Sequence, residues 1–285
     1  MTTNLEAGGI VIREICEAAE MRAVEQLQKE VWGIPDLDVV PVSQLVAAIA
    51  AGGVLIGAFD GIRLVGFAYG FAGYEHGRTT HHSHMLAVLP AYRNYSVGYR
   101  LKLAQREFVI GQGVDVMTWT FDPLQSLNAY FNFNRLGVVS DRYFVNFYGE
   151  DAASFLHGNG TDRLWVTWLL NSQRVRGRLD GAGNAADIRE VTPLVELGED
   201  EAPRCYSLGE CLSLDQAAIE IPADINALER QNRTVAVEWR EATRWAFTGA
   251  ISNGFKVEGF YRTERKDRKT GVYRLRRSES LDDQD

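Results

Sequence analysis

The feature that most constrains the fold is a two-residue break between two runs of strand-forming residues. Residues 54–59 and 62–71 are rich in aliphatic and aromatic side chains, and only Asp60-Gly61 separates them. An Asp-Gly loop favours a turn with positive φ, which joins neighbouring antiparallel strands. The sequence therefore predicts a β-hairpin here, with an antiparallel sheet built around it.

Apolar residues at helical spacing indicate helices on both sides of this hairpin. One such stripe, in the first helix, comprises Met21, Val24, Leu27 and Val31, and another, over residues 97–110, comprises Val97, Leu101, Ala104 and Phe108. The other predicted elements are strands over residues 10–15, 79–88, 114–121, 138–147 and 163–170 and helices over residues 42–49 and 126–136. This order predicts an α/β (α+β) fold with a mixed, mostly antiparallel sheet.

The composition changes after residue 173. We expect a first domain over residues 1–173, a glycine-rich linker over 174–187, a smaller α+β unit over 188–277 and a disordered tail over 278–285. The smaller unit is predicted to contain a strand over 217–221, a helix over 234–253 and a final hairpin. Its pairs Trp239-Arg240 and Arg244-Trp245 are interpreted as arginine stacked on tryptophan.

Charge and cysteine content narrow the function classes. The formal net charge is −8 and the pI is about 5.3, which argues against a nucleic-acid-binding protein. Cys16, Cys205 and Cys211 form no C-x-x-C pair, so reduced thiols are expected. With no signal-peptide pattern and no long apolar run, we expect a cytoplasmic protein without a membrane partner.

Residues 81–100 predict a strand, a polar turn and a helix in succession. The backbone N–H groups at a helix N-terminus, together with the helix dipole, favour binding of a pyrophosphate. Arg93 in the turn can add charge-assisted hydrogen bonds to the same phosphates. This pattern alone also fits an ordinary βα turn.

The turn resembles the coenzyme A-binding motif of the Gcn5-related N-acetyltransferase (GNAT) superfamily, V-x-P-x-Y/F-R/Q-x-x-G-x-G/A. The matching residues are Val88, Pro90, Tyr92, Arg93 and Gly98. Ser96 replaces the first glycine. The departure is mild if the Ser96 side chain caps the helix, and otherwise it restricts how closely a pyrophosphate approaches. The resemblance covers roughly residues 8–170.

The resemblance implies a GNAT fold with a splayed strand pair, and acetyl-CoA or another short acyl-CoA as co-substrate without a metal. The implied cofactor-binding residues are Leu86, Ala87, Val88, Leu89, Arg93, Asn94, Tyr95, Ser96, Val97, Gly98, Asn128 and Phe131. A backbone N–H between residues 87 and 89 would polarise the thioester carbonyl.

A second segment of the superfamily, N-x-x-A-x-x-x-Y-x-x-x-G-F, is similar to residues 128–138. Phe133 stands where the superfamily places the tyrosine that serves as general acid. Tyr130, three residues earlier, would project from nearly the same helical face and is our substitute. A buried packing tyrosine is the alternative interpretation.

Four of the five histidines lie between residues 76 and 84, and His82, His84, Leu86 and Val88 alternate on one predicted strand face. A metal site is the weakest interpretation, because the spacing supplies only two ligands. A structural role and a general-base role both stay open. The segment resembles the H-x-H-x-L-A-V strand of arylalkylamine N-acetyltransferases, which implies a proton path through His82 or His84.

The acceptor is predicted to be the amine of a small molecule, with amino acids as a subcase. Asp36 and Asp38 in the loop after the first helix could hold its ammonium group, and Trp119 could shape an apolar pocket. Solvated loop acids and a core tryptophan are the alternatives. A non-catalytic acyl-CoA sensor, a protein lysine acetyltransferase and a homodimer formed through the C-terminal unit also stay open.

Overall fold

The computed structural model describes residues 9–149, 159–181, 191–265 and 268–278. Contacts divide the chain into two units, of which the first contains the described residues up to Trp119 and the second those from Thr120. The sequence predicts a boundary at residue 173, whereas the contacts group residues 120–149 and 159–173 with the C-terminal elements.

Unit 1 is built on strands in the order β1-β2-β3-β4-β5. Their bounds are β1 (Ile10–Glu14), β2 (Val54–Asp60), β3 (Arg63–Glu75), β4 (Arg78–Val88) and β5 (Val116–Phe121), the last of which runs into unit 2. The pairings from β1 to β4 are antiparallel, and β4 pairs with β5 in parallel.

The predicted hairpin between β2 and β3 is confirmed. Asp60 pairs with Arg63, so the turn is centred on Gly61 and Ile62, one residue later than predicted. Gly61 takes the positive φ of 57° that the turn requires.

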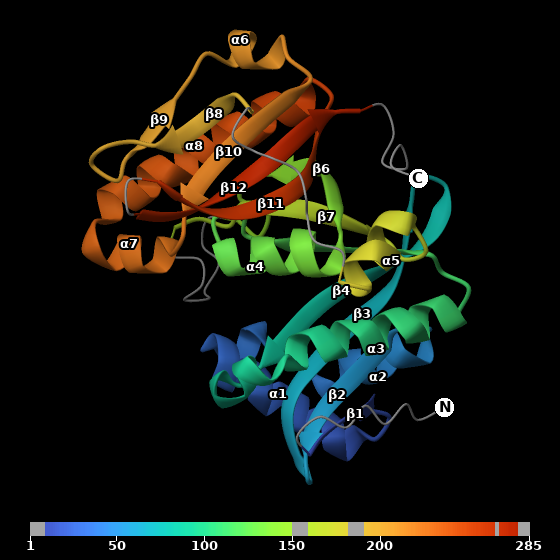
Figure 1. Ribbon diagram of the computed structural model, residues 1–285. Helices are drawn as coiled ribbons and strands as arrows, with labels where there is room; N and C mark the ends of the chain where they lie inside the picture. The colour runs from blue at the N-terminus through green and yellow to red at the C-terminus, as the bar shows by residue number, and fades with distance from the viewer. Residues whose placement is uncertain (1–8, 150–158, 182–190, 266–267, 279–285) are drawn as a thin grey trace. The chain divides into compact units, whose positions relative to one another are not determined.

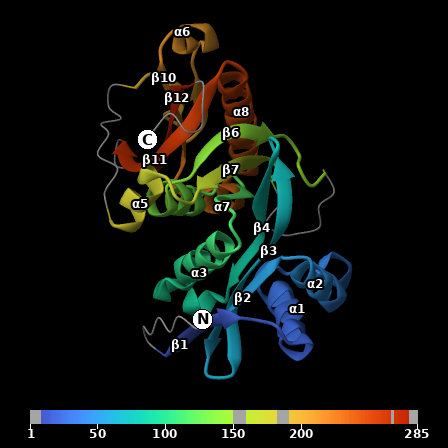
Figure 2. The same cartoon turned by 90° about the vertical axis from the view of Figure 1, so that its right-hand side faces the viewer.

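Helices cover both faces of this sheet (Figure 2). α1 (Ala18–Trp32) and α2 (Val42–Ala50) lie on one face, and α3 (Val97–Gly111) lies on the other. On the α1 face, Trp32 meets Phe67 edge-on at 6.0 Å between ring centroids. On the α3 face, β3 carries small residues. A Cβ added at Gly66 of β3 would lie 2.9 Å from the Ala87 carbonyl oxygen and 3.3 Å from the Leu101 side chain. The small residues therefore allow α3 to pack closely on β3 and β4.

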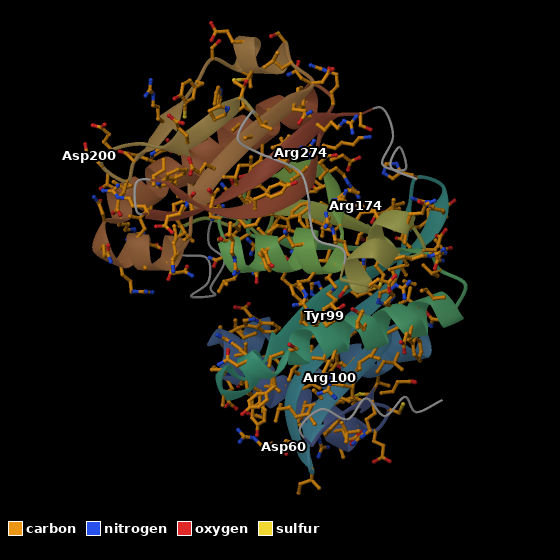
Figure 3. The ribbon with its side chains drawn as sticks, viewed as in Figure 1. Asp60, Tyr99, Arg100, Arg174, Asp200 and Arg274 are labelled. Atoms are coloured by element: carbon orange, nitrogen blue, oxygen red, sulfur yellow. The ribbon has the colours of Figure 1, made fainter. Side chains whose placement is uncertain are left out.

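The buried face of α3 differs from the predicted stripe. Ala104 and Phe108 are only half-buried, while Lys102 and Gln105 are buried. Arg100, labelled in Figure 3, is also buried, and its guanidinium donates to the Ile10 carbonyl oxygen of β1 at 2.7 Å. This face of the sheet is therefore partly polar, which hydrophobic spacing cannot predict.

Unit 2 forms a sheet in the order β7-β6-β11-β12-β10-β8-β9. Its strands are β6 (Val139–Phe144), β7 (Arg163–Leu169), β8 (Pro193–Leu197), β9 (Pro203–Cys205), β10 (Gln216–Pro222), β11 (Phe255–Arg265) and β12 (Arg268–Arg277). Its helices are α4 (Ser126–Tyr130), continued by the π-helical segment η3 (Phe131–Leu136), α5 (Gln173–Leu179), α6 (Leu208–Leu212), α7 (Ile225–Gln231) and α8 (Arg233–Ser252). α8 packs against the sheet (Figure 1). The predicted fold class, α/β with a mixed and mostly antiparallel sheet, is confirmed.

Two predictions for the C-terminal part need correction. Residues 173–179 form helix α5, capped by the Ser172 hydroxyl, where the sequence predicts a linker. The rest of that linker from residue 182, and the predicted tail apart from Ser278, lie outside the described residues. In addition, β8, β9, α6 and α7 have no counterpart in the prediction.

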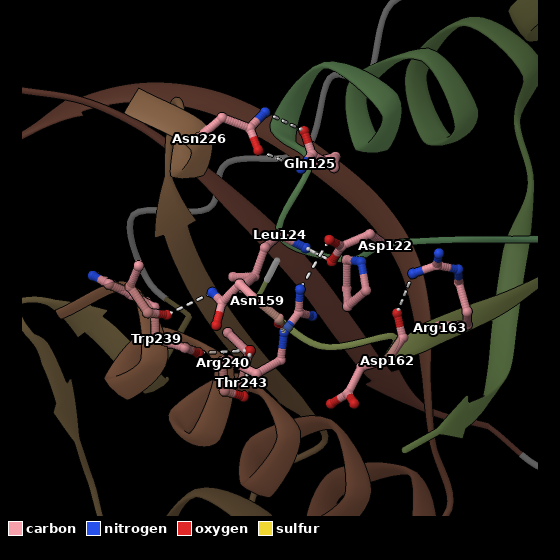
Figure 4. A network of polar contacts seen from close by, with 12 residues as sticks. Asp122, Leu124, Gln125, Asn159, Asp162, Arg163, Asn226, Trp239, Arg240 and Thr243 are labelled. Atoms are coloured by element: carbon pink, nitrogen blue, oxygen red, sulfur yellow. Dashed lines mark hydrogen bonds and ion pairs between the residues drawn. The ribbon is translucent and has the colours of Figure 1, made fainter. Parts of the chain in front are cut away.

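Arginines of α8 form ion pairs rather than stacking on their neighbouring tryptophans. Arg240 donates to Asp122 at 2.8 Å, as Figure 4 shows. Arg244 donates to both carboxylate oxygens of Asp162 at 2.9 Å. Asp162 also accepts from the Tyr143 hydroxyl and the Asn146 backbone N–H. Burial acts to raise the pKa of Asp162, but these hydrogen bonds outweigh it and lower the pKa.

Within the described residues, no single helix is long and apolar enough to cross a membrane. Only a helix pair over residues 18–50 reaches the required length and composition, and it is bent by 118° at the break between its helices.

Asp162 is predicted to be critical for the stability of unit 2. Asp162→Ala leaves Arg244, Tyr143 and the Asn146 N–H without their acceptor and should lower the free energy of unfolding by about 3–5 kcal/mol. Asp215→Ala removes an 88%-exposed carboxylate 4.0 Å from Arg277 and is the matched control, with an expected change within about 0.5 kcal/mol. Urea unfolding followed by circular dichroism measures both, and equal effects would contradict the prediction.

Candidate active site

Strand β4 pairs with β3 along its length but with β5 at only two residues. Its pairs with β5 are His81 with Met117 and His82 with Thr118. On the opposite edge β4 stays paired with β3 as far as Val88. Such limited parallel pairing is what the predicted splayed strand pair requires.

A β-bulge in β4 changes which side chains share a face. Gly70 pairs with Ser83 and Tyr69 with Met85, so His84 is an extra residue between them. His82 and His84 both contact Phe71, with centroid distances of 5.5 and 5.6 Å. Leu86 and Val88 instead lie on the α3 face, each 3.8 Å from a Cβ placed at Gly98. The prediction that all four residues share one face is therefore wrong, because the bulge reverses the alternation after His84.

His82 belongs to a chain of hydrogen bonds that ends at a carboxylate. The Thr118 hydroxyl donates to Glu75 at 3.1 Å, and Nδ1 of His82 lies 3.1 Å from the same hydroxyl oxygen. Because the Thr118 proton is directed to Glu75, Nδ1 of His82 is the donor to Thr118. In the neutral ring Nε2 then carries the lone pair and can accept a proton.

His84 lies beside His82, with 6.2 Å between the ring centroids. Tyr69 meets it edge-on at 6.2 Å. The ring keeps an exposed edge, yet the protein atoms packed around it desolvate the imidazole and lower its pKa below the usual 6.5. His84 is therefore neutral at pH 7 and can accept a proton.

The turn after β4 is a 3₁₀-helical segment, η2 (Pro90–Tyr95), that leads directly into α3. Tyr92 anchors it by donating from its hydroxyl to Asp60 at 2.7 Å. Ser96 has φ 55° and ψ 24°, and its side chain makes no capping hydrogen bond. Of the two alternatives left open by the sequence, the side-chain cap is therefore not formed. Ser96 adopts the left-handed conformation that a glycine takes without steric cost.

The start of α3 presents donors and space for an anionic group. The first turn of any α-helix leaves N–H groups without intrahelical acceptors, and the bond from the Arg100 N–H to the Ser96 carbonyl begins the helical series here. Arg93 is exposed beside this turn, with Nε 3.4 Å from the Val88 carbonyl oxygen. Asn94 and Tyr95 are also exposed. The residues present therefore fit a pyrophosphate.

Gly98, in the first turn of α3, could carry a Cβ without a clash in the protein. A Cβ at this position would make only ordinary contacts of 3.8 Å with Leu86 and Val88. The packing of unit 1 therefore does not require glycine at residue 98, whereas close approach of a ligand to the helix backbone would.

The three expected backbone donors of β4 are not equivalent. The Leu89 N–H donates to the Val65 carbonyl oxygen at 2.9 Å, so Leu89 is excluded as the donor to a thioester carbonyl. In an antiparallel pair the N–H groups alternate between the two edges of the strand. The Ala87 N–H therefore points toward β3, and the N–H groups of Leu86 and Val88 point toward the β5 edge.

The predicted acceptor-site residues lie apart along the chain. Asp36 and Asp38 are exposed in a 3₁₀ turn, η1 (Asp36–Asp38), and Asp36 pairs with Lys29 at 2.6 Å. Trp119 is buried, with the Lys102 ammonium nitrogen 3.6 Å from its ring centroid, which places it on the α3 face away from His82. Their contact with an acceptor remains a prediction.

The remaining predicted residues belong to unit 2. The Arg262 guanidinium lies 4.1 Å from the centroid of the half-buried Tyr130 ring. Phe133 is fully buried against Phe121 and Tyr273. Asn128 is exposed and Phe131 is half-buried. The role of Tyr130 as general acid remains a prediction.

Sequence reasoning missed four residues around the histidines: Tyr69, Phe71, Glu75 and Thr118. Tyr69 and Phe71 could have been found, since they alternate along the predicted strand toward one face. Glu75 and Thr118 are 43 residues apart and only the strand pairing joins them to His82. Among the described residues, no group of three or more His, Cys, Asp or Glu side chains could hold a metal ion.

No family model matches the sequence, and no curated protein matches it. Solved structures that match include a putative GNAT-family acetyltransferase from Desulfovibrio desulfuricans, at 13% identity over 56% of this chain and 99% of that one, with a TM-score of 0.46. A putative acetyltransferase from Salmonella typhimurium with its cofactor acetyl-CoA is 14% identical over 63% and 100% of the chains, with a TM-score of 0.46. A GNAT-family acetyltransferase from Elizabethkingia anophelis with acetyl-CoA bound is 13% identical over 57% and 99%, with a TM-score of 0.44.

TM-scores below 0.5 do not by themselves establish a fold or an activity. The assignment of the site therefore rests on β4, η2 and α3 of this chain.

Substitutions at residue 96 test whether the turn holds this residue in the left-handed conformation. Ser96→Gly removes the steric cost and should leave stability unchanged or raise it by up to about 1 kcal/mol. Ser96→Val places a β-branched residue at φ 55° and should lower stability by more than about 1 kcal/mol. Thermal unfolding of the two variants compares them, and a Val variant as stable as the Gly variant would mean that the turn is not held in this conformation.

Proposed function

We propose that this chain transfers a short acyl group from acyl-CoA to the amine of a small molecule. The observation that carries the proposal is the succession of β4, η2 and α3, in which Ser96 is left-handed and the packing does not itself require a glycine at residue 98. Backbone donors, an adjacent Arg93 and the helix dipole suit a pyrophosphate. The motif resemblance supports coenzyme A as the molecule that contains this pyrophosphate.

The proton chemistry of amine acylation suits the two histidines. An alkylammonium must lose a proton before its nitrogen can attack the thioester carbonyl. Nε2 of His82 accepts this proton, directly or through a water, while Thr118 and Glu75 hold the ring and its tautomer. A C–N bond forms, the C–S bond breaks, and the thiolate of CoA takes up a proton.

The oxyanion that forms during attack needs a donor on the β4 edge facing β5. Val88 meets that requirement among the three residues expected from the sequence, because Leu89 and Ala87 direct their N–H groups to β3. We assign the stabilising N–H to Val88. No side chain is then needed for this role.

The kind of molecule that accepts the acyl group distinguishes the proposed enzyme from an acyl-CoA sensor and from a lysine acetyltransferase. We propose a small amine, with amino acids as the first class to examine and with acetyl- or succinyl-CoA as donor. An acyl-CoA sensor would bind the cofactor without turnover, and a lysine acetyltransferase would act only on peptide substrates. Free-thiol release measured with both donors against amino acids, simple amines and a lysine peptide distinguishes the three.

Gly98→Ala should separate cofactor binding from folding. The added Cβ meets only 3.8 Å contacts, so stability should not fall. The Kd for CoA should rise roughly tenfold or more if the pyrophosphate approaches the helix backbone at residue 98 as proposed. Gly111→Ala in the same helix adds a methyl group with nothing within 4 Å and is the matched control. Calorimetric titration with CoA measures both. Equal affinity in the two variants would place the pyrophosphate elsewhere.

The histidines predict a defined pH dependence. His82→Gln should lower kcat by roughly 10²–10⁴-fold without changing the affinity for CoA, since only proton transfer is lost. Because burial lowers the pKa of His84, any acid decline of kcat/KM that comes from this ring should have its midpoint below 6.5. A decline centred above 6.5 would exclude His84 as its source, and full turnover in His82→Gln would remove His82 from the mechanism.

A further inference from the structure

A chain of buried polar side chains lies on the α3 face of β4, opposite the two candidate bases. Lys102 donates to the Ser83 hydroxyl oxygen at 2.7 Å, and that hydroxyl donates to the Gln105 side-chain oxygen at 2.7 Å. The Gln105 amide nitrogen lies 3.2 Å from Nε2 of His81. Each of the four residues is at most 4% exposed.

The direction of these bonds fixes the tautomer of His81. The Gln105 amide nitrogen can only donate, so Nε2 of His81 is its acceptor and the His81 proton sits on Nδ1. Burial, with the nearby Lys102 and His82, lowers the pKa of His81 to about 3. Burial also lowers the pKa of Lys102 well below its usual value. Within the described residues Lys102 makes no ion pair.

A glycine of β3, Gly70, leaves the space in which these buried polar side chains meet. A Cβ at Gly70 would lie 2.3 Å from Nε2 of His81 and 2.9 Å from the Gln105 amide nitrogen. The side chains can meet only because β3 has no side chain there. This series of hydrogen-bonded side chains therefore depends on both α3 and β3. It holds His81 and Ser83, the two neighbours of His82 in the sequence.

The last residue of β4 held by these hydrogen bonds, Ser83, directly precedes the β-bulge. Ser83 is the last residue of β4 in register before the extra residue His84. Residues 82 to 84 alternate regularly, so His82 and His84 lie on the Phe71 face because Ser83 between them lies on the α3 face. If Ser83 were released, both histidines could leave their contacts with Phe71.

We propose that Lys102 is a positioning residue for His82 and His84, acting through its hydrogen bond to Ser83 to fix the β-bulge. The inference rests on the proposed acyl transfer, in which the two histidines handle the proton. A lysine buried without a carboxylate partner is costly for folding. The Trp119 ring and the Ser83 hydroxyl are the contacts that offset this cost, and only the second of them reaches β4 beside His82.

Lys102→Met tests the inference, because methionine keeps the length of the side chain and lacks the amine. The expected result is a kcat lowered roughly 10- to 100-fold, with an unchanged KM for acyl-CoA and an unfolding temperature that is equal or higher. Lys269→Met, at an exposed position of β12, is the control and should change none of the three. A purely structural lysine would instead lower the unfolding temperature and leave kcat per folded molecule intact, and that result would overturn the inference.

Ser83→Ala provides a second route to the same question. It breaks the bond to Lys102 and also the bond to Gln105, so it should lower kcat at least as much as Lys102→Met. The double variant should be no worse than Ser83→Ala alone, because the Lys102–Ser83 bond is already lost there. Additive losses would show that Lys102 acts by another route and would overturn the inference.

A readout without turnover separates this inference from the proposed function. Nuclear magnetic resonance titration of the His84 ring in Lys102→Met should show its pKa moved up toward 6.5, as the ring leaves its packed position. An unchanged pKa overturns the positioning role even if the protein proves to be an active acyltransferase. A shifted pKa in a protein that turns over no amine would refute the acyl transfer and leave the structural coupling standing.

Discussion

The arrangement of unit 1 depends on how β4 divides its hydrogen bonds between its two neighbours. On the β3 edge it is paired almost throughout, with one bulge at His84, and on the β5 edge it is paired at His81 and His82. The N–H groups of Leu86 and Val88 therefore point to the edge that faces β5. The position of the bulge then decides which side chains face Phe71 and which face α3.

Unit 2 depends on a different interaction, the buried carboxylates that hold α8. Asp122 and Asp162 lie at the beginning of unit 2 and before β7, and each accepts from an arginine of α8. These contacts join segments more than 80 residues apart. The C-terminal helix is therefore an integral part of the sheet that contains β6 and β7, which explains why the contacts do not divide the chain at residue 173.

The sequence was sufficient for the elements whose signals are local. The β2–β3 hairpin, α3 and α8 follow from turn chemistry and hydrophobic spacing, and the strand–turn–helix of the candidate cofactor site follows from its motif. The bulge at His84 could not be predicted, since one extra residue changes the facing of Leu86 and Val88 without any compositional mark. The Thr118–Glu75 support of His82 and the buried Lys102 were also missed, because strand register and tertiary packing decide them.

The small residues of β3 have a kinetic consequence. Gly66 and Gly70 let α3 lie so close to β3 and β4 that added methyl groups would overlap the Ala87 carbonyl oxygen and His81. A helix seated in this way has little freedom to slide, so its N-terminus is already in place before any anion arrives. Association with such a preorganised end requires no ordering of the backbone. Differences in affinity among donors would then appear mainly as differences in residence time.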